Sequence, residues 1–185
     1  LLTQIMLQTP ALLGFVMSWL IHSSVTATIT ETEGLKLLAS GIVFALGIIG
    51  PVIGLTLFGQ ESCKSAGINR NSFDALFGFT FISQGIIETP ILLVFITAVT
   101  LCFTAASSVE YAHVVYLASA VCMGMSTLVP GISSGATAQT ACQKITHNPE
   151  EYSTIANTSF LSQVFIETNA IYALILVFVM IFTLP

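Results

Sequence analysis

Ser83–Leu93 reads SQGIIETPILL and Ser162–Tyr172 reads SQVFIETNAIY, so the motif Ser-Gln-x-x-Ile-Glu-Thr occurs twice in one chain. Each copy places a glutamate, Glu88 or Glu167, inside a long apolar stretch. A charged carboxylate without a partner costs several kcal/mol at the centre of a bilayer, so such a residue marks a functional site by default. The motif therefore predicts two functional sites within the membrane, and its two positions show how the two halves of the chain align.

The composition indicates an integral, multi-pass membrane protein. Of the 185 residues, 55% are hydrophobic and 7% are charged, and the mean hydropathy is +0.93. Apolar stretches of about 20 residues, the length that crosses a bilayer as a helix, cover nearly the whole chain. Because an open sheet edge cannot face lipid, the predicted fold class is all-α. The net charge of −5 and the lack of a Lys/Arg cluster exclude nucleic acid as a partner.

The two motifs belong to a longer repeat with a constant offset of 79 positions. The matching pairs are Ser40 and Ser119, Pro51 and Pro130, Gln60 and Gln139, Cys63 and Cys142, Asn69 and Asn148, Gln84 and Gln163, Glu88 and Glu167, and Thr89 and Thr168. Each unit is predicted to be a helical hairpin, 34–108 and 109–185, with a polar turn at 67–71 or 146–150. Since each unit crosses the membrane twice, the repeats are parallel rather than inverted.

A third, partial copy precedes these hairpins. Thr3–Pro10 aligns with Ser83–Pro90 at an offset of 80, and Gln8 replaces the glutamate. We interpret residues 1–33 as the outer helix of a degenerate hairpin, which gives five membrane helices, and Gln4, Gln8 and Thr9 as the remnant of an uncharged site. This segment lacks the basic start and cleavage site of a secretory leader. We expect the natural protein to extend upstream of Leu1 or to have lost the partner helix.

The two helices of each hairpin differ in character. The first helices carry small residues at spacings of three and four, which let helix backbones approach closely in lipid: Gly47, Gly50, Gly54, Gly131 and Gly135. The second helices are rich in Phe, Ile, Leu and Val. This difference predicts a tight inner layer and an outer layer that faces lipid. Lys64, Arg70 and Lys144 lie by the polar turns, against Lys36 at the other ends, so the turns are predicted to face the cytoplasmic side.

The glutamates have polar neighbours on the same helix. Gln84 and Glu88 are four residues apart, as are Gln163 and Glu167, so each amide and carboxyl share a helix face. Thr89 and Thr168 add hydroxyls, and Tyr172 could add another to the second site. No embedded Lys or Arg neutralises either glutamate, so a cation from solution, H⁺ or Na⁺, must do so. The structural alternative, a glutamate that only hydrogen-bonds a neighbouring helix, would have to occur twice with the same flanking residues.

These elements resemble a known family. Residues 48–71, IIGPVIGLTLFGQESCKSAGINRN, followed by SQGIIETPILL, resemble the inner helix, polar loop and carboxylate-bearing outer helix of the c-subunit, the rotor-ring proteolipid of F-type ATP synthases. Residues 128–150, LVPGISSGATAQTACQKITHNPE, followed by SQVFIETNAIYALI, resemble it more closely. The resemblance covers nearly the whole chain, and the elements occur in the same order twice.

The resemblance implies a non-catalytic subunit without a cofactor, in an energy-coupling membrane of a bacterium or an organelle. Copies of the chain would form a ring, and Glu88 and Glu167 would each load one ion from the a-subunit of the synthase. Rotation would then couple ion flow to ATP chemistry on other subunits. The turns would touch the central stalk through Asn69, Arg70, Asn148 and Pro149.

Two departures from the family pattern leave alternatives open. Fused hairpins, one with its carboxylate replaced, resemble V-type proteolipids. The inner-helix glutamine of sodium-binding rings is Leu55 in the first unit and Ser134 in the second, and Leu55 offers no oxygen. The oxygens of the outer helices still favour Na⁺ at Glu88 and Glu167, because a hard cation takes several oxygen ligands.

A small ion channel or carrier without rotation is a further alternative, and a purely structural membrane scaffold is another. The glycine faces and the parallel repeat argue against the carrier, because carriers usually build their sites at broken helices.

Overall fold

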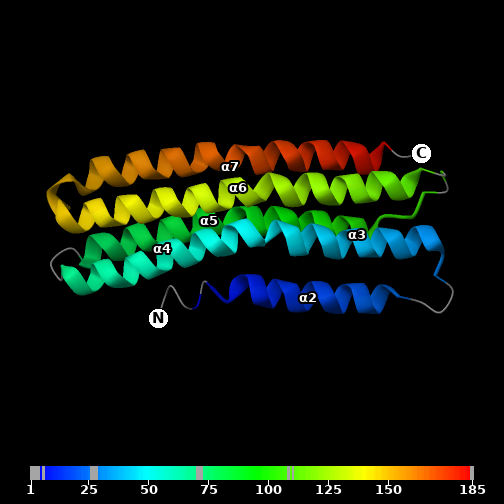
Figure 1. Ribbon diagram of the computed structural model, residues 1–185, viewed down its shortest axis with the longest axis horizontal. Coiled ribbons are helices and arrows are strands. Elements are labelled where there is room, and N and C mark those ends of the chain that lie inside the picture. The colour runs from blue at the N-terminus through cyan, green and yellow to red at the C-terminus, as the bar shows by residue number, and fades with distance from the viewer. Residues whose placement is uncertain are drawn as a thin grey trace.

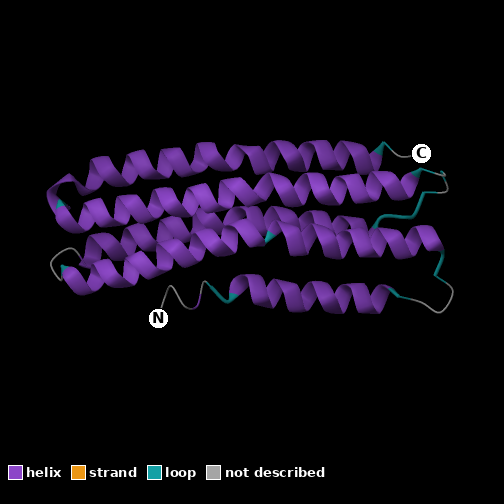
Figure 2. Cartoon of the chain, viewed as in Figure 1, coloured by secondary structure: helices purple, strands orange, loops and turns teal. Residues whose placement is uncertain are grey.

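The computed structural model describes residues 5, 7–25, 29–69, 73–107, 109 and 111–183. Within these ranges all regular elements are helices, as predicted (Figure 2). They are α2 (Thr9–Ser24), α3 (Glu31–Gly47), α4 (Ile49–Ile68), α5 (Phe73–Phe103), α6 (Ala112–His147), the short 3₁₀ helix η2 (Pro149–Glu151) and α7 (Tyr152–Phe182).

The helices lie side by side along one long axis (Figure 1). Helix α4 continues α3 in nearly the same direction, and α5 returns beside them, as α7 returns beside α6. Extensive contacts join α3 and α4 to α6, whereas α5 contacts α7 and α2 contacts α5 and α3. We call α3, α4 and α6 the inner layer and α2, α5 and α7 the outer layer.

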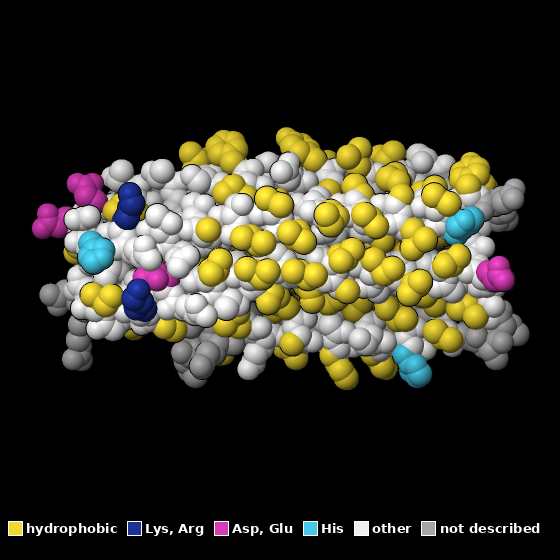
Figure 3. Space-filling model, in the orientation of Figure 1, with side chains coloured by type: hydrophobic (Ala, Val, Ile, Leu, Met, Phe, Trp, Pro, Cys, Tyr) yellow, Lys and Arg dark blue, Asp and Glu magenta, His cyan; other side chains and the backbone are white. Residues whose placement is uncertain are grey.

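Four helical stretches are long and apolar enough to cross a membrane: Glu31–Ile68, Phe73–Phe103, Ala112–His147 and Pro149–Phe182. Helix α2 has 16 residues and falls short of the roughly 20 that a bilayer requires. Of the five predicted membrane helices, the described residues therefore bear out four. On the face that Figure 3 shows, hydrophobic side chains lie along the middle, and charged and histidine side chains gather toward the two ends.

The inner layer is held together where glycines of α4 and α6 meet. A Cβ atom placed on Gly54 would fall inside contact distance of the Gly131 backbone, and one on Gly135 would collide with the Gly54 backbone. Gly50 meets the backbone of Leu128 in the same way. Gly47, in contrast, faces the Val94 side chain of α5. Small residues thus allow α4 and α6 to pack backbone against backbone.

The junction of α3 and α4 at Ile48 follows from Pro51. Proline has no backbone N–H, so it cannot donate to the carbonyl four residues earlier, which belongs to Gly47. The Thr127 hydroxyl of α6 lies 3.0 Å from that Gly47 carbonyl and also 3.0 Å from the Gly124 carbonyl of its own helix, so the two carbonyls share its proton. An unpaired carbonyl is costly in lipid, where water cannot replace the lost partner. Thr127 therefore compensates for the proline and ties the two inner helices together.

We expect Gly135→Ala to destabilise the fold by about 1–3 kcal/mol, because the new methyl group can be accommodated only if α4 and α6 move apart. The measurement is the midpoint of thermal unfolding in detergent, followed by circular dichroism. Gly67→Ala is the control, since among the described residues no atom beyond its own helix backbone and chain neighbours lies within 4 Å of a Cβ at that position. Equal effects of the two substitutions would contradict the proposed role of the glycine contact.

We expect Thr127→Val to lower the free energy of unfolding by about 1–3 kcal/mol, since it leaves the buried Gly47 carbonyl without a donor. Thr127→Ser keeps the hydroxyl and should restore most of the loss. The same unfolding measurement applies. If Ser and Val at this position were equally unstable, loss of the methyl packing rather than of the hydrogen bond would be the cause.

Candidate ion-binding site

The two glutamates occupy equivalent turns of neighbouring outer helices. Glu88 lies on α5 and Glu167 on α7, and these helices contact each other. Glu167 is buried, with 6% of its surface exposed, while Glu88 is half-buried. Both lie within the candidate membrane spans. The sequence motif has therefore placed two carboxyl groups inside the helix bundle.

Glu167 receives a hydrogen bond from the inner layer. The Ser134 hydroxyl of α6 donates to Glu167 Oε1 at 3.3 Å, and Ser134 is fully buried. Ser134 directly precedes Gly135, which packs against Gly54 of α4. The close packing of the inner helices thus holds in place the helix turn that supplies this hydroxyl.

Gln163 links α7 to α5 next to the same carboxyl. Its amide nitrogen donates to the hydroxyls of Ser159 at 3.0 Å and Ser83 at 3.3 Å. Its amide oxygen is buried and accepts no hydrogen bond from the described residues. With the nitrogen held by two hydroxyls, the oxygen is the end of the amide that remains available as a ligand.

The surroundings of Glu88 differ. The inner-helix position that corresponds to Ser134 is Leu55, which is fully buried and offers no oxygen, as the sequence indicated. The hydroxyl that hydrogen-bonds the Glu88 side chain comes instead from Thr9 of α2. Glu88 Oε1 and both polar atoms of Gln84 are buried and have no hydrogen-bond partner among the described residues.

In the described part of the chain, no hydrogen bond joins three other predicted ligands, Thr89, Thr168 and Tyr172, to the carboxyl groups. The Thr89 hydroxyl donates to the Gly85 carbonyl at 3.2 Å, and the Thr168 hydroxyl donates to the Phe165 carbonyl at 2.7 Å. Tyr172 is 64% exposed. Such back-bonding satisfies a hydroxyl within its own helix but leaves its lone pairs free.

The remaining predicted positions lie at the chain's turns and at its start. The Asn69 amide donates to the Thr146 carbonyl at 3.0 Å, so the two polar turns contact each other. Asn148 and Pro149 are exposed, as is Gln8. Arg70 and Gln4 lie outside the described residues.

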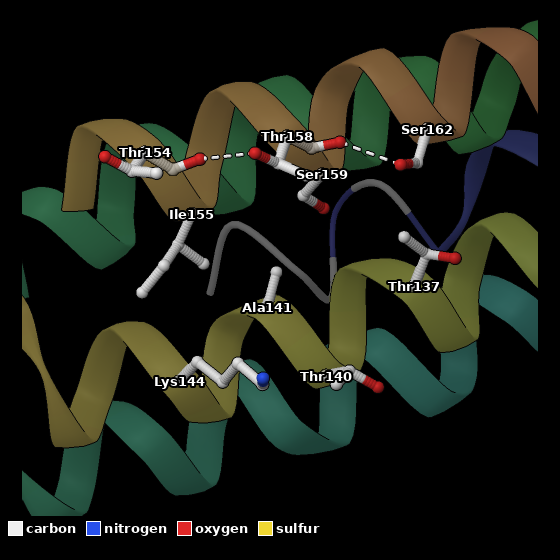
Figure 4. A pocket seen from close by; sticks show the side chains of 9 residues that line it. All are labelled: Thr137, Thr140, Ala141, Lys144, Thr154, Ile155, Thr158, Ser159 and Ser162. Carbon is white, nitrogen blue, oxygen red and sulfur yellow. Dashed lines mark hydrogen bonds between the residues drawn. The ribbon is translucent and has the colours of Figure 1, made fainter. Parts of the chain in front are cut away.

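The open edge of α6 and α7 is grooved on the turn side of Glu167. This groove has a volume of about 430 Å³ and is lined by Thr137, Thr140, Ala141, Lys144, Thr154, Ile155, Thr158, Ser159 and Ser162 (Figure 4). Thr158 and Ser162 donate their hydroxyls to carbonyls one turn earlier, each at 2.8 Å. A wall of methyl groups and back-bonded hydroxyls is suited to contact with another helix in lipid.

Sequence reasoning missed three residues of these sites: Ser83, Ser159 and Thr9 as a partner of Glu88. Two of them had a readable signal. Ser83 is the first residue of the repeated motif, and Ser159 is four residues before Gln163, which places the two on one helix face. The contact of Thr9 depends on how α2 packs and has no local signal.

The arrangement can hold a proton or a hard cation at each glutamate. Among the described residues, the only ion pair joins Lys64 to Glu61 at 3.8 Å, so it neutralises neither Glu88 nor Glu167. Buried acceptors without donors are rare because they cost free energy. Among the described residues, the Oε1 atoms of Glu88, Gln84 and Gln163 are of this kind. Carboxylate, amide and hydroxyl oxygens are the ligands that hard cations prefer.

Comparison with known proteins agrees with this geometry. Residues 117–180, which run from α6 into α7, match the protein family of ATP synthase C subunits. The ATP synthase c-subunit of a Synechococcus species is 36% identical over 69 residues, which are 37% of this chain and 85% of the relative. The chain belongs to the ATP synthase c-subunit family.

Other relatives in this family are likewise aligned over most of their own length but over less than half of this chain. The ATP synthase c-subunit of Gloeobacter violaceus is 35% identical over 82 residues, 44% of this chain and 92% of the relative. A c-subunit of the ATP synthase of Cereibacter sphaeroides is 32% identical over 69 residues, 37% of this chain and 83% of the relative. Most of each relative therefore corresponds to less than half of this chain. The c-subunit resemblance predicted from the sequence is confirmed over the C-terminal part of the chain, and with it the assignment as a non-catalytic rotor subunit.

We expect Ser134→Ala to increase the reaction of Glu167 with a hydrophobic carbodiimide by about threefold at a pH where labelling of the unmodified protein is almost suppressed. The reagent attacks the neutral acid, and loss of the donor from Ser134 disfavours the ionised form. Peptide mapping by mass spectrometry measures Glu167 and Glu88 separately. Glu88 is the internal control, and an equal rise at both residues would contradict a direct role of Ser134.

Proposed function

We propose that this chain is an ion-carrying subunit of the membrane rotor of an F-type ATP synthase, with Glu88 and Glu167 as the carriers of Na⁺ or H⁺. Each carrier would load an ion from the a-subunit, and rotation would couple ion flow to ATP synthesis or hydrolysis on other subunits. Residues 34–108 and 109–185 would form two units of a ring.

The observation that carries this proposal is the pair of carboxyl groups in register on the outer helices, each next to a buried glutamine and a hydroxyl. A structural glutamate would need its oxygens satisfied within the protein. Here one carboxylate oxygen of Glu88, Oε1, and the amide oxygens of Gln84 and Gln163 remain without donors in the described residues. A bound proton or sodium ion supplies the missing positive charge in both units.

Assembly into a ring is supported by the two open edges of the chain. At one edge, the groove of Figure 4 and a second groove of about 400 Å³, lined in part by Asn169 and Tyr172, run along α6 and α7. At the other edge, an apolar groove of about 550 Å³ lies between α2 and α3. Copies of the chain packed edge to edge would cover both and would bring Tyr172 against a neighbour.

The charge distribution supports the orientation. Lys64 and Lys144 lie by the turns that join α4 to α5 and α6 to α7. The positive-inside tendency then places these turns, with Asn69, Asn148 and Pro149, on the cytoplasmic side, where they would meet the central stalk. The membrane would be an energy-coupling membrane.

We favour Na⁺ over H⁺ because each glutamate has an amide oxygen and a hydroxyl nearby. We expect a hydrophobic carbodiimide to label Glu88 and Glu167, with labelling falling as pH rises because the reagent needs the neutral acid. NaCl should slow the reaction at both residues, whereas KCl at equal concentration is the control for ionic strength. Peptide mapping measures the extent of labelling.

The outcomes separate the alternatives. Labelling that Na⁺ does not change would identify the proton as the carried ion. Absence of labelling at both residues would overturn the carrier role. If Glu88→Gln and Glu167→Gln left ATP-driven ion transport intact in the assembled complex, the chain would be a structural scaffold instead.

A further inference from the structure

A small polar cavity lies between α2, α3 and α5 at the end of the molecule opposite the polar turns. It has a volume of about 150 Å³ and is lined by Ser24, Ile29, Glu33, Lys36, Leu37 and Cys102. The candidate ion sites use none of these residues. The cavity therefore needs an explanation of its own.

Lys36 is the cation of this cavity, and it is deeply buried, with 6% of its surface exposed. Lysines near the ends of membrane helices ordinarily extend their ammonium group to water. Here the ammonium donates to the carbonyl of Thr104, the residue after the end of α5. A carbonyl does not neutralise the charge, and an ammonium has further protons to donate. Among the described residues, the only ion pair is that of Lys64 and Glu61, so no carboxylate pairs with Lys36.

Glu33 supplies a negative charge to the same cavity, one turn before Lys36 on α3. Its carboxylate accepts hydrogen bonds from the backbone N–H and the hydroxyl of Thr30, at 2.9 and 3.0 Å. These bonds belong to the capping box at the start of α3 and hold the carboxylate in place. Glu33 and Lys36 thus line one cavity without forming an ion pair in the described part of the chain. This arrangement suits a ligand that carries both signs of charge.

An apolar groove begins beside the cavity. Ile29 and Leu37 line both, and the groove continues between α2 and α3 with a volume of about 550 Å³. The helical stretch Glu31–Ile68 has 38 residues, far more than the roughly 20 that cross a bilayer. The first turns of α3, with the cavity, therefore reach the level of the lipid headgroups, while the groove runs into the hydrocarbon layer.

We propose that the cavity and the groove together bind one phospholipid whose headgroup carries a primary amine, such as phosphatidylethanolamine. The phosphate accepts from the Lys36 ammonium, the amine donates to the Glu33 carboxylate, and an acyl chain fills the groove. A purely anionic headgroup would match Lys36 but would meet Glu33 without a compensating cation. A choline headgroup has the positive charge but no N–H to donate.

This inference goes beyond the proposed function and does not depend on it, because every residue of the lipid site belongs to one chain. In the proposed ring, a neighbouring copy would meet the lipid at this edge. The competing explanation is that the neighbouring copy itself fills the groove and that water fills the cavity. A neighbouring helix needs only shape and apolar surface in the groove, whereas a bound phospholipid depends on the charges of Glu33 and Lys36.

The test uses membranes that contain the full chain in its complex, together with a phosphatidylethanolamine that has a photoreactive acyl chain. Peptide mapping locates the label, and unlabelled phosphatidylethanolamine, phosphatidylglycerol and phosphatidylcholine are compared as competitors. The variants are Lys36→Met, Lys36→Arg and Glu33→Gln. The glutamine keeps the capping box, which accepts Gln as well as Glu. Lys64→Met is the matched control, because Lys64 lies by the polar turns and its side chain is 67% exposed.

We expect the label on α2 and α3, with phosphatidylethanolamine as the strongest competitor. Lys36→Met should raise the phosphatidylethanolamine concentration that halves labelling about tenfold, because a charge-assisted hydrogen bond to the phosphate is lost. Lys36→Arg and Lys64→Met should behave as the unmodified protein. Glu33→Gln should remove the preference for phosphatidylethanolamine over phosphatidylglycerol, since the carboxylate that distinguishes them is gone.

Absence of label from α2 and α3 in the assembled complex would overturn the inference in favour of a neighbouring copy. Equal competition by the three lipids would also overturn it, because the groove would then be only an apolar surface in contact with lipid. If the Lys36→Met protein does not assemble, the Glu33→Gln comparison decides alone, and an unchanged lipid preference there would refute the site. These outcomes are independent of the carbodiimide reaction of Glu88 and Glu167, which tests the proposed function.

Discussion

The backbone contact between α4 and α6 is the constraint on which the other features depend. Gly54, Gly131 and Gly135 allow the two inner helices to approach until backbone meets backbone. Lipid gives no hydrophobic drive for helices to associate, so close packing and interhelical hydrogen bonds must hold them. At this short distance, Thr127 reaches the carbonyl that Pro51 leaves unpaired. Ser134, beside Gly135, lies in the same packed region and contacts the carboxyl of the outer helix.

Serine and threonine hydroxyls form hydrogen bonds with polar atoms in parts of the helices where lipid leaves no water to do so. Many serines and threonines donate to a carbonyl of their own helix, as Thr89 and Thr168 do. A smaller number reach across to another helix: Thr127 to a carbonyl, Ser134 and Thr9 to carboxyl groups. These three bonds lie where a proline or an embedded glutamate creates a demand that the local helix cannot meet, whereas Ser62 and Thr80 join α4 to α5 by pairing their two hydroxyls at 2.7 Å.

Much of the fold and part of the site could be predicted from the sequence because these features are local or periodic. Membrane helices follow from hydropathy, and the repeat offset placed Glu88 and Glu167 in register. Tyr172 shows the limit, since its 64% exposure depends on helix rotation and on neighbours beyond a single chain. The contact of Thr9 with Glu88 joins residues 79 positions apart through the packing of α2, which no spacing in the sequence reveals. The sequence also predicted a fifth membrane helix, but α2 has 16 residues, too few for a span. Its length depends on the residue at which the helix begins, which hydropathy alone does not define.

The two units carry the same residues on the outer helix of each site but different residues at the inner-helix position that faces it. Gln, Glu and Thr are identical in both copies, yet Leu55 and Ser134 stand at equivalent inner positions. A buried leucine removes an oxygen but strengthens the apolar cluster around Ile87 and Ile91. Helix α2 packs beside this cluster through Leu7 and Leu13, and its Thr9 side chain lies next to Glu88. Removal of α2 would expose the part of this cluster that Leu7 and Leu13 cover and would take away the Thr9 side chain beside Glu88.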